Sequence, residues 1–371
     1  MRKAIAFLTL FLLGGCSTGT QIEDLALILG TGIDEKEKGM FEEEKVVTIT
    51  SEILNTETEG GQEKGASQAY FLESISGKTI NDAISKQKLL HPKEVSALHN
   101  NVVVFGESVL QNGITEIVSE FTRIASIRGS TYIVGVKGKA YDLLKSSAVE
   151  EKSISDSMVK LINRQGIKTK AIEILEEASG KPQDSVVPLL DTMEFEGQTR
   201  LMISGAAVLN GGKLAGYLNH KEMELVALLQ NQKPSLGIKV KVMYKNKPVE
   251  VVLGNSHFKL NSVLSDNKPK FIFNGVLTFN VDKAPLGGIT TTEDVSNVEL
   301  LTKKELNRKL TALTKKIIVK YQCDALGLGN HLYRFRPSYW KKNHNNWGSS
   351  LPEVDVDFKT DVTIKSVGRH G

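Results

Sequence analysis

Two kinds of hydrophobic pattern alternate through the first half of this chain. Short apolar runs have the length and composition of buried strands, at 25–29, 46–53, 102–105 and 132–136. Stretches with apolar residues three or four positions apart predict helices, at 79–90, 114–121, 154–162 and 171–178. Because strands and helices alternate, this region is expected to form an α/β layer. The first strand is expected to end at Gly30-Thr31-Gly32, and the segments 34–45 and 55–68 are expected to be turns and loop.

The second half begins with a predicted hairpin at Asn210-Gly211-Gly212 and a helix over 220–229. Residues 238–244 and 354–364 alternate apolar and charged side chains, which predicts an antiparallel sheet with one wet face. Between them, Thr302-x-x-Glu305 fits a capping box that would start a long amphipathic helix. Its apolar stripe consists of Leu306, Leu310, Leu313, Ile317 and Tyr321, and should cover the dry sheet face. The predicted fold class is α+β and multi-domain, with mixed or antiparallel sheets packed against helices.

The first residues have the pattern of an exported protein. Arg2 and Lys3 precede an apolar run over 4–13, which as a helix would extend about 15 Å, half of a bilayer core. Such a run is typical of a secretory signal. Leu13-Gly14-Gly15-Cys16 resembles a bacterial lipobox, which implies S-diacylglycerol on Cys16 and cleavage before it, with N-acylation left open. The alternative is a plain cleaved signal with an incidental cysteine.

These patterns divide the chain into a signal peptide at 1–15, a lipidated tether at 16–21, an N-terminal α/β region at 22–200 and a C-terminal α+β domain at 201–371. Charge follows a similar division. Residues 16–204 carry a net charge of −9 and residues 205–371 a net charge of +11. Either the halves contact each other or they face different partners, although uneven sampling of surface charge would give the same numbers.

Cysteine usage excludes a disulfide framework. The chain has two cysteines, and lipidation of Cys16 would leave Cys323 without a partner. Cys323 follows an apolar helical stretch and is expected to be buried. The alternative for this residue is a redox thiol.

Candidate chemistry is sparse. No phosphate-binding loop, zinc motif or cysteine pair is present. His220, Glu222 and Glu224 do not share one helix face, because only positions i and i+4 align. Asp355 and Asp357 share a strand face with lysines, which indicates a solvated mixed-charge surface. We therefore assign no catalytic, cofactor-binding or metal-ligating residue and predict that the protein is not an enzyme.

A basic surface is more distinctive. The long helix carries the cations Lys303, Lys304, Arg308, Lys309, Lys315, Lys316 and Lys320. Further along, Arg334, Arg336, Lys341 and Lys342 are interleaved with Tyr333, Phe335, Tyr339, Trp340 and Trp347. Export argues against nucleic acid as the partner and favours anionic headgroups or acidic loops of a membrane protein. The alternative is a solvated helix face beside an aromatic lid on the core.

Four stretches in order resemble one family. They are IEDLALILGTGID at 22–34, a segment at 77–114 that contains NNVVVFGESVLQNGI, GAAVLNGGKLAGYLNHKE at 205–222, and a segment at 323–368 that begins CDALGLGNHLYRFRPSYW. Together they are similar to the Ger(x)C family, the C-subunit lipoproteins of bacterial spore germinant receptors. The resemblance implies an α+β body of several small domains. It also implies assembly with integral-membrane A and B subunits, at the outer face of the spore inner membrane.

The function that follows is a lipid-anchored, non-enzymatic subunit of a nutrient germinant receptor, with membrane lipid and the A and B subunits as partners and no cofactor. The competing function is a lipid-anchored extracytoplasmic solute-binding protein that captures a small molecule in a deep cleft. A third, an exported enzyme, would need a pocket with strongly perturbed ionisable groups.

Overall fold

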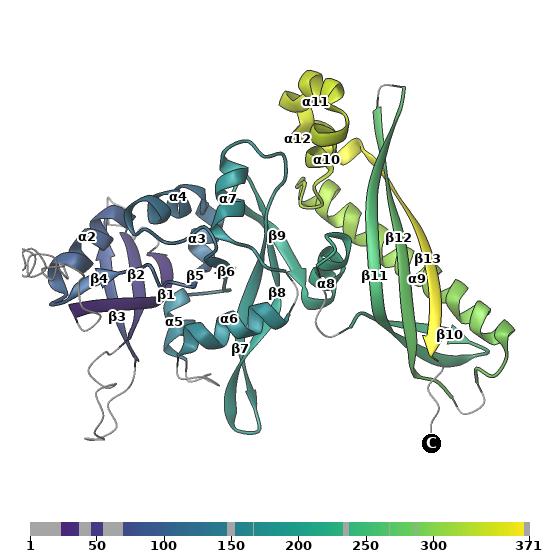
Figure 1. The fold of residues 1–371 in the computed structure, drawn as a ribbon, viewed down its shortest axis with the longest axis horizontal. Coiled ribbons are helices and arrows are strands. Elements are labelled where there is room, and N and C mark those ends of the chain that lie inside the picture. The colour runs from purple at the N-terminus through teal and green to yellow at the C-terminus, as the bar shows by residue number, and fades with distance from the viewer. Residues whose placement is uncertain are drawn as a thin grey trace, which may run out of the picture.

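A computed structural model of the chain describes residues 24–36, 46–54, 70–146, 153–165, 167–232, 237–266, 268–285 and 288–366. Two β-sheets lie one after the other along the long axis, each covered by helices (Figure 1). The fold is therefore α+β, as the sequence predicts. The predicted signal 1–15, the tether 16–21 and the expected loop 55–68 lie outside the described residues.

The first sheet is mixed and has nine strands in the order β3-β2-β1-β5-β6-β7-β8-β9, with β4 beside β1. The strands are β1 (Leu25–Lys36), β2 (Val46–Leu54), β3 (Tyr70–Gly77), β4 (Glu94–Ser96), β5 (Val102–Phe105), β6 (Tyr132–Gly135), β7 (Val186–Phe195), β8 (Gln198–Asn210) and β9 (Lys213–Asn219). The central strands β1, β5, β6 and β7 run parallel, and antiparallel hairpins extend the sheet on both sides. The parallel centre confirms the alternation of strands and helices expected from the sequence.

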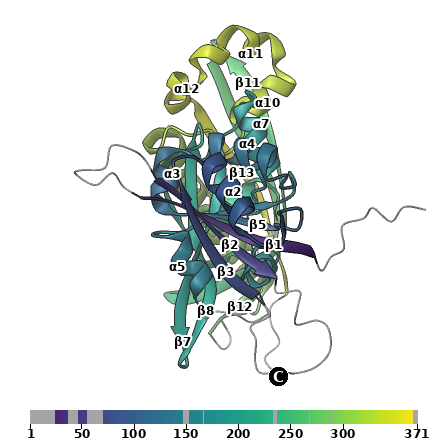
Figure 2. The same cartoon turned by 90° about the vertical axis from the view of Figure 1, so that its left-hand side faces the viewer.

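Helices cover both faces of this sheet. They are α2 (Ile80–Leu90), α3 (Glu107–Asn112), α4 (Thr115–Ile124), α5 (Ala140–Lys145), α6 (Ile154–Arg164) and α7 (Ala171–Ala178). In β5, Val103 and Phe105 pack with α2, α3, α4 and α7, whereas Val102 and Val104 pack with α5 and α6. Successive strand residues point to opposite faces, so the short run VVVF supplies both cores. Figure 2 shows α3 and α5 on opposite sides of the strands.

The first strand is longer than the sequence indicates. The expected end at Gly30-Thr31-Gly32 is wrong, because β1 continues to Lys36. A Cβ on Gly32 would lie 2.7 Å from Leu144 Cδ1 and 3.0 Å from Ala140 Cβ of α5. These glycines therefore permit close helix packing against the strand rather than a turn.

The second sheet has four strands in the order β10-β11-β12-β13. The strands are β10 (Lys239–Tyr244), β11 (Lys247–Ser265), β12 (Lys268–Lys283) and β13 (Asp355–Ser366). The helices of this half are α8 (His220–Leu229), α9 (Thr292–Lys315) with a π-helical end at Lys316–Lys320, α10 (Leu328–Phe335), α11 (Pro337–Asn343) and α12 (Trp347–Ser350). Short 3-10 turns lie at His344–Asn346 and Leu351–Glu353. The antiparallel arrangement expected from the sequence is wrong for β13, which runs parallel to β12 because the chain returns through α9 to α12 between these two strands. The wet face of β13 alternates as predicted, and Lys270 lies 2.8 Å from Asp357 on it.

Helix α9 begins eleven positions earlier than predicted. The capping box is formed by Thr291 and Asp294: Asp294 N donates to Thr291 Oγ1 over 3.1 Å, and Thr291 N donates to Asp294 Oδ2 over 3.0 Å. The predicted cap at Thr302 is wrong, since Thr302 is buried inside the helix. The apolar stripe is confirmed as core: Leu306, Leu310, Leu313 and Ile317 are all buried, and Tyr321 packs against that core just beyond the helix.

One hydrophobic core joins the two sheets through α8. Every residue from Met223 to Leu229 is buried, which is the pattern of a helix enclosed on all sides. The same contiguous cluster contains Val102 in the first sheet and Ile364 in the second. The division at residues 200 and 201 stays a prediction. By strand pairing, β8 runs across that point and the change of sheet falls after β9.

Candidate functional site

One buried and two half-buried carboxyl groups lie where the two halves of the molecule meet. We call Glu177, Asp184 and Asp324 the junction acids. Glu177 lies in the last turn of α7, Asp184 lies in the link from α7 to β7, and Asp324 follows the π-helical end of α9. Asp184 precedes Asp324 by 140 positions and Glu177 lies further upstream, yet the three residues share one hydrogen-bond network.

Asp324 organises the C-terminal side of this network. Its Oδ1 accepts from Leu328 N over 2.7 Å, and its Oδ2 accepts from Gly329 N over 2.6 Å and from Trp347 Nε1 over 3.0 Å. Helix α10 begins after Gly327, which has no side chain to cap it. The carboxylate of Asp324 therefore satisfies the free N–H groups of α10 and fixes α12 through Trp347.

Asp184 and Glu177 tie the first sheet to that segment. Asp184 accepts from Asp324 N over 2.6 Å and from Gly211 N over 3.3 Å. Glu177 accepts from Gly212 N over 3.1 Å and from Ser185 Oγ over 2.6 Å. The predicted hairpin turn at Gly211 and Gly212 is confirmed, and both glycines have positive φ. This turn is therefore one wall of the junction.

Burial shifts the ionisation of these groups. Removal from water raises the pKa of Asp324 to about 7 and that of Glu177 to about 7, against the pull of the donors that face them. Burial also raises the pKa of Asp184. Cys323 is buried as predicted, and burial beside these acids raises the pKa of its thiol to about 12. A thiol held in its protonated form is a poor nucleophile, so the redox alternative for Cys323 loses support.

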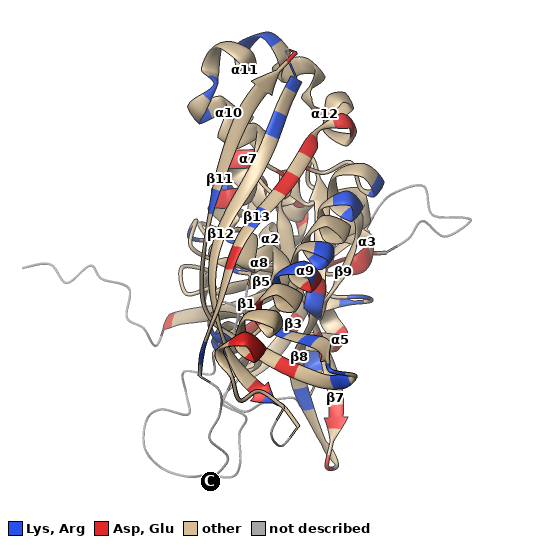
Figure 3. Ribbon diagram, turned by 90° about the vertical axis from the view of Figure 1, so that its right-hand side faces the viewer, with Lys and Arg blue, Asp and Glu red and all other residues tan. Residues whose placement is uncertain are grey.

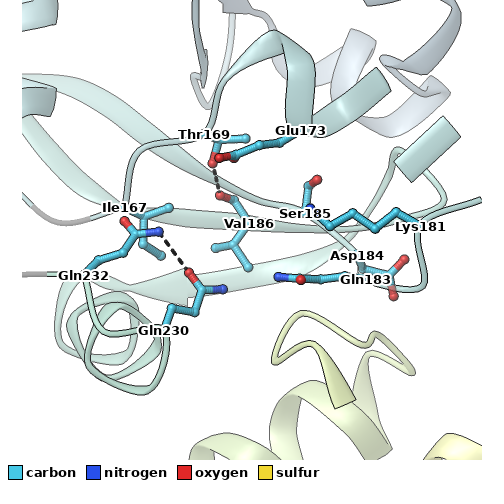
Figure 4. Close-up of a pocket in the computed structure, with 10 residues that line it drawn as sticks. All are labelled: Ile167, Thr169, Glu173, Lys181, Gln183, Asp184, Ser185, Val186, Gln230 and Gln232. Atoms are coloured by element: carbon cyan, nitrogen blue, oxygen red, sulfur yellow. Dashed lines mark hydrogen bonds between the residues drawn. The ribbon is translucent and has the colours of Figure 1, made fainter. Parts of the chain in front are cut away.

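A small polar pocket opens beside the junction acids (Figure 4). Its volume is about 120 Å³, and it is lined by Ile167, Thr169, Glu173, Lys181, Gln183, Asp184, Ser185, Val186, Gln230 and Gln232. Gln232 donates to Gln230 over 3.2 Å, and Gln230 donates to Ala325 O over 3.0 Å. The pocket thus lies between the end of α8, the α7–β7 link and the C-terminal half, with amides and carboxyl groups as its walls.

A wider groove of about 470 Å³ separates α7 from α10 and α11. It is lined by Ile172, Leu175, Glu176, Ser179, Gly180, Lys181, Pro182, Asn330, Tyr333, Arg334 and Trp340. Two cations line this groove. Lys181 pairs with Glu176 over 2.6 Å, whereas Arg334 makes no ion pair among the described residues.

Two further carboxylates act on helix N-termini of the first sheet. Asp34 of β1 accepts from Ala140 N and Tyr141 N at 2.7 and 2.9 Å, and Glu52 of β2 accepts from Ile154 N and Ser155 N, both at 3.0 Å. In α/β proteins such N–H groups often bind phosphates. Here the chain's own acids occupy them at α5 and α6.

His220, Glu222 and Glu224, considered above as a possible metal site, do not converge on one point. Glu222 accepts from Asn219 N over 2.9 Å and from Lys316 Nζ over 2.7 Å, whereas His220 Nδ1 lies 4.0 Å from Glu224 Oε2. Within the described ranges, no group of three or more His, Cys, Asp or Glu could hold a metal ion. Cys16, the predicted lipidation site, lies outside the described residues. In the part of the chain that is described, no helix is both long and apolar enough to cross a membrane.

Some of the basic and aromatic residues noted in the sequence cover the core, and others are exposed on the surface. Trp347 is buried and its ring meets Phe271 edge-on at 6.2 Å, so the predicted aromatic lid is confirmed there. Tyr333 and Phe335 remain 58% and 65% exposed. On α9, Arg308 pairs with Glu305 over 2.8 Å, while Lys303, Lys304, Lys315 and Lys320 are exposed.

Sequence reasoning missed the junction acids. Asp324 is the single acid in the apolar stretch 323–332, and an isolated acid just before Gly-Leu-Gly is a signal that could have suggested a helix-capping role. Nothing in the local sequence links it to Asp184 or Glu177, because their contact arises only when the two sheets pack.

Known proteins match this chain along nearly its whole length. Residues 19–192 match a family model described as spore germination protein N-terminal domain, and residues 204–368 match one described as spore germination B3/GerAC like, C-terminal. Spore germination protein B3 of Bacillus subtilis (strain 168) is 24% identical over 375 residues, covering 98% of this chain and 96% of that protein. Spore germination protein A3 of the same strain is 24% identical over 383 residues, covering 100% and 99%. The crystal structure of the GerBC protein has the same fold, with a TM-score of 0.58 and 18% identity over 91% of this chain and 98% of that one.

Proposed function

Because the chain belongs to the Ger(x)C family of spore germination proteins, we propose that it is the lipid-anchored, non-enzymatic subunit of a nutrient germinant receptor. It is held at the outer face of the spore inner membrane, beside the integral-membrane A and B subunits. The observation that carries the proposal is the match of both family models, in order, to a chain whose first residues resemble a lipoprotein signal.

The anchor in this proposal is diacylglycerol on Cys16. Asp24, where the described body begins, is eight positions after Cys16, and a fully extended chain of that length spans about 28 Å at most. The body therefore stays close to the lipid surface. One acyl chain gives only marginal membrane binding, whereas two or three give a stable anchor.

The role that we propose for the body is mechanical. A continuous core and the junction acids connect both sheets, so a force or contact at one end is transmitted to the other. Asp324 binds the N-terminus of α10 and Glu177 binds the hairpin turn, a structural use that supports a scaffold rather than a catalyst. This observation favours docking of a rigid subunit onto membrane-embedded partners.

The test is a Cys16→Ala variant in spores, with Ser17→Ala as the matched control. We expect Cys16→Ala to lose the inner-membrane fraction and the germination response to nutrients, and Ser17→Ala to keep both. Affinity purification of the control from spore membranes should recover the A and B subunits. A Cys16→Ala protein that remains membrane-bound and supports germination would contradict the anchor.

The pocket beside the junction acids supports a second candidate function, direct capture of a small polar solute. Its polar walls suit such a ligand, but about 120 Å³ is well below the roughly 300–1,000 Å³ typical of ligand sites. The volume therefore argues against solute capture in this pocket. Titration calorimetry of the protein with amino acids and sugars distinguishes the two, because only a solute-binding protein gives saturable heat.

A further inference from the structure

One end of the C-terminal half exposes aromatic and basic side chains together. We call the surface formed by Tyr333, Arg334, Phe335 and Arg336 at the end of α10, with Lys341 and Lys342 of α11, the basic-aromatic cap. All six side chains are exposed. Phe335 contacts His331 at a ring distance of 4.8 Å and still leaves 65% of its surface in solvent.

The cap has no internal counter-charge. Residues 325–352 contain four cations and no Asp or Glu. Among the described residues, Arg334, Arg336, Lys341 and Lys342 make no ion pair, whereas Lys268 and Lys270 at the start of β12 do. Lys268 pairs with Glu353 and Lys270 with Asp357, whereas the four cations of the cap have no carboxylate partner among the described residues. Figure 3 shows their Lys and Arg segments at one end of the molecule.

Exposed aliphatic residues adjoin the cap. Arg336 Nη2 donates to Ser262 O over 2.8 Å, and His331 Nε2 lies 3.1 Å from Ser262 Oγ, which fixes the cap against the far end of β11. The next two residues, Val263 and Leu264, are 52% and 41% exposed. Figure 1 shows α10, α11 and the β11–β12 tip at the same end of the C-terminal half. The acids near this tip are Asp266 in the turn and Glu353, which pairs with Lys268 over 3.5 Å.

We propose that the basic-aromatic cap and the β11–β12 tip rest on an anionic lipid bilayer surface. Aromatic side chains that sit at the headgroup level, aliphatic side chains that enter the acyl boundary, and cations that bind anionic lipid are the composition of interfacial membrane contacts. The inference builds on the proposed anchor at Cys16, which keeps the body close to lipid. It adds a second, non-covalent contact and so fixes the orientation of the elongated body.

Charge and position favour lipid over an acidic protein segment. The groove between α7 and α10 would suit such a segment, but Phe335, Lys341 and Lys342 do not line it. The most exposed aromatic residue and three of the four cations of the cap thus lie outside the groove. An unpatterned excess of positive charge fits a diffuse anionic surface better than a partner that needs fixed pairing.

The experiment uses the full mature protein, purified with its acyl chains and reconstituted into vesicles. Ser338→Cys places a thiol on the exposed part of α11 without altering a cap residue, and an environment-sensitive dye is attached to it. Buried Cys323 does not compete for the dye. Vesicles are made of phosphatidylcholine, or of phosphatidylcholine mixed with phosphatidylglycerol.

We expect the dye emission to shift to the blue only with the phosphatidylglycerol mixture. Each cation near the surface changes partitioning about fivefold, so Lys341→Gln with Lys342→Gln should weaken the contact about 30-fold. Lys303→Gln with Lys304→Gln on α9 removes the same charge and should leave the contact unchanged. Tyr333→Ser with Phe335→Ser should reduce the blue shift at any lipid composition.

Each other outcome overturns a specific statement. Emission that does not respond to phosphatidylglycerol, or equal losses in both lysine pairs, refutes the lipid contact at the cap. A shift that appears only when the receptor's integral-membrane subunits are added assigns the cap to a protein interface and also refutes it. Failure of the protein to float with phosphatidylcholine vesicles refutes the Cys16 anchor instead, while the response to the phosphatidylglycerol mixture still decides the cap.

Discussion

Asp324 should couple the stability of the protein to pH in the neutral range. Its carboxylate accepts three hydrogen bonds, from Leu328 N, Gly329 N and Trp347 Nε1. Asp324→Ala leaves all three donors without this acceptor. Since a buried donor without a partner costs about 1–3 kcal/mol, the free energy of unfolding should fall by about 3 kcal/mol or more.

Asp324→Asn separates the charge from the hydrogen bonds. It keeps one acceptor oxygen and the size of the side chain, but it does not titrate. Burial raises the folded-state pKa of Asp324 to about 7 from 3.8, so between these values the native state binds more protons than the unfolded state. The stability due to this group is complete at acid pH and is lost as the pH rises through 7.

The magnitude follows from that shift. At about 1.4 kcal/mol for each pKa unit, raising the pH from about 5 to about 8 should remove about 2–3 kcal/mol of wild-type stability through Asp324 alone. The Asn variant lacks this loss. The difference in unfolding free energy between the wild type and Asp324→Asn should therefore shrink by that amount over this pH range, with Glu177 titrating equally in both proteins.

Urea unfolding followed by tryptophan fluorescence measures this difference at each pH. The chain's two tryptophans are Trp340 and Trp347, and Trp347 is itself a partner of Asp324. Asp266→Asn at the exposed β11–β12 turn is the matched control and should show no pH-dependent difference. A constant gap between wild type and Asp324→Asn from pH 5 to pH 8 would refute the assignment of a raised pKa to Asp324.

Three further outcomes test the fold. Gly32→Ala places a Cβ 2.7 Å from Leu144 Cδ1 and should lower the free energy of unfolding by about 1–3 kcal/mol. Gly348→Ala is the control, because its Cβ meets nothing within 4 Å and should not lower the stability. Equal melting temperatures of the two variants would contradict the close packing at Gly32. Thr291→Ala removes the cap of α9 and should cost about 1 kcal/mol in denaturant titrations, while Thr302→Val should cost less, because Thr302 Oγ1 is buried without a partner among the described residues. Cys323 should react with a thiol reagent only in denaturant, and fast labelling of the native protein would show that its thiol is not buried.

Local pattern was sufficient for the elements that bury one regular face. The stripe Leu306, Leu310, Leu313 and Ile317 predicts the core face of α9, because apolar residues that recur with the period of an α-helix lie on the side that is buried. The alternation along 354–364 likewise predicts the wet and dry faces of β13. The hairpin at Gly211 and Gly212 follows from backbone conformations that favour glycine.

The predictions were wrong where a residue type suits a local turn or cap but its actual role is set by tertiary packing. Gly30 and Gly32 resemble a turn, but α5 and α6 pack so closely on β1 that a side chain would not fit there. Thr302 has the right neighbours for a cap and lies inside a helix that an earlier Thr291 already starts. The sequence carries both possibilities, and only packing against the sheet selects one.

What the sequence determined by itself is the set of amphipathic segments, the family and the signal-like start, since these depend on residues close together in the chain. The tertiary structure decided where the acids go. Asp184 and Asp324 are 140 positions apart, and they meet because α8 buries itself between the two sheets and closes the junction around them. Such a contact depends on the packing of apolar faces that no local pattern encodes, which is why the junction acids were found only in three dimensions.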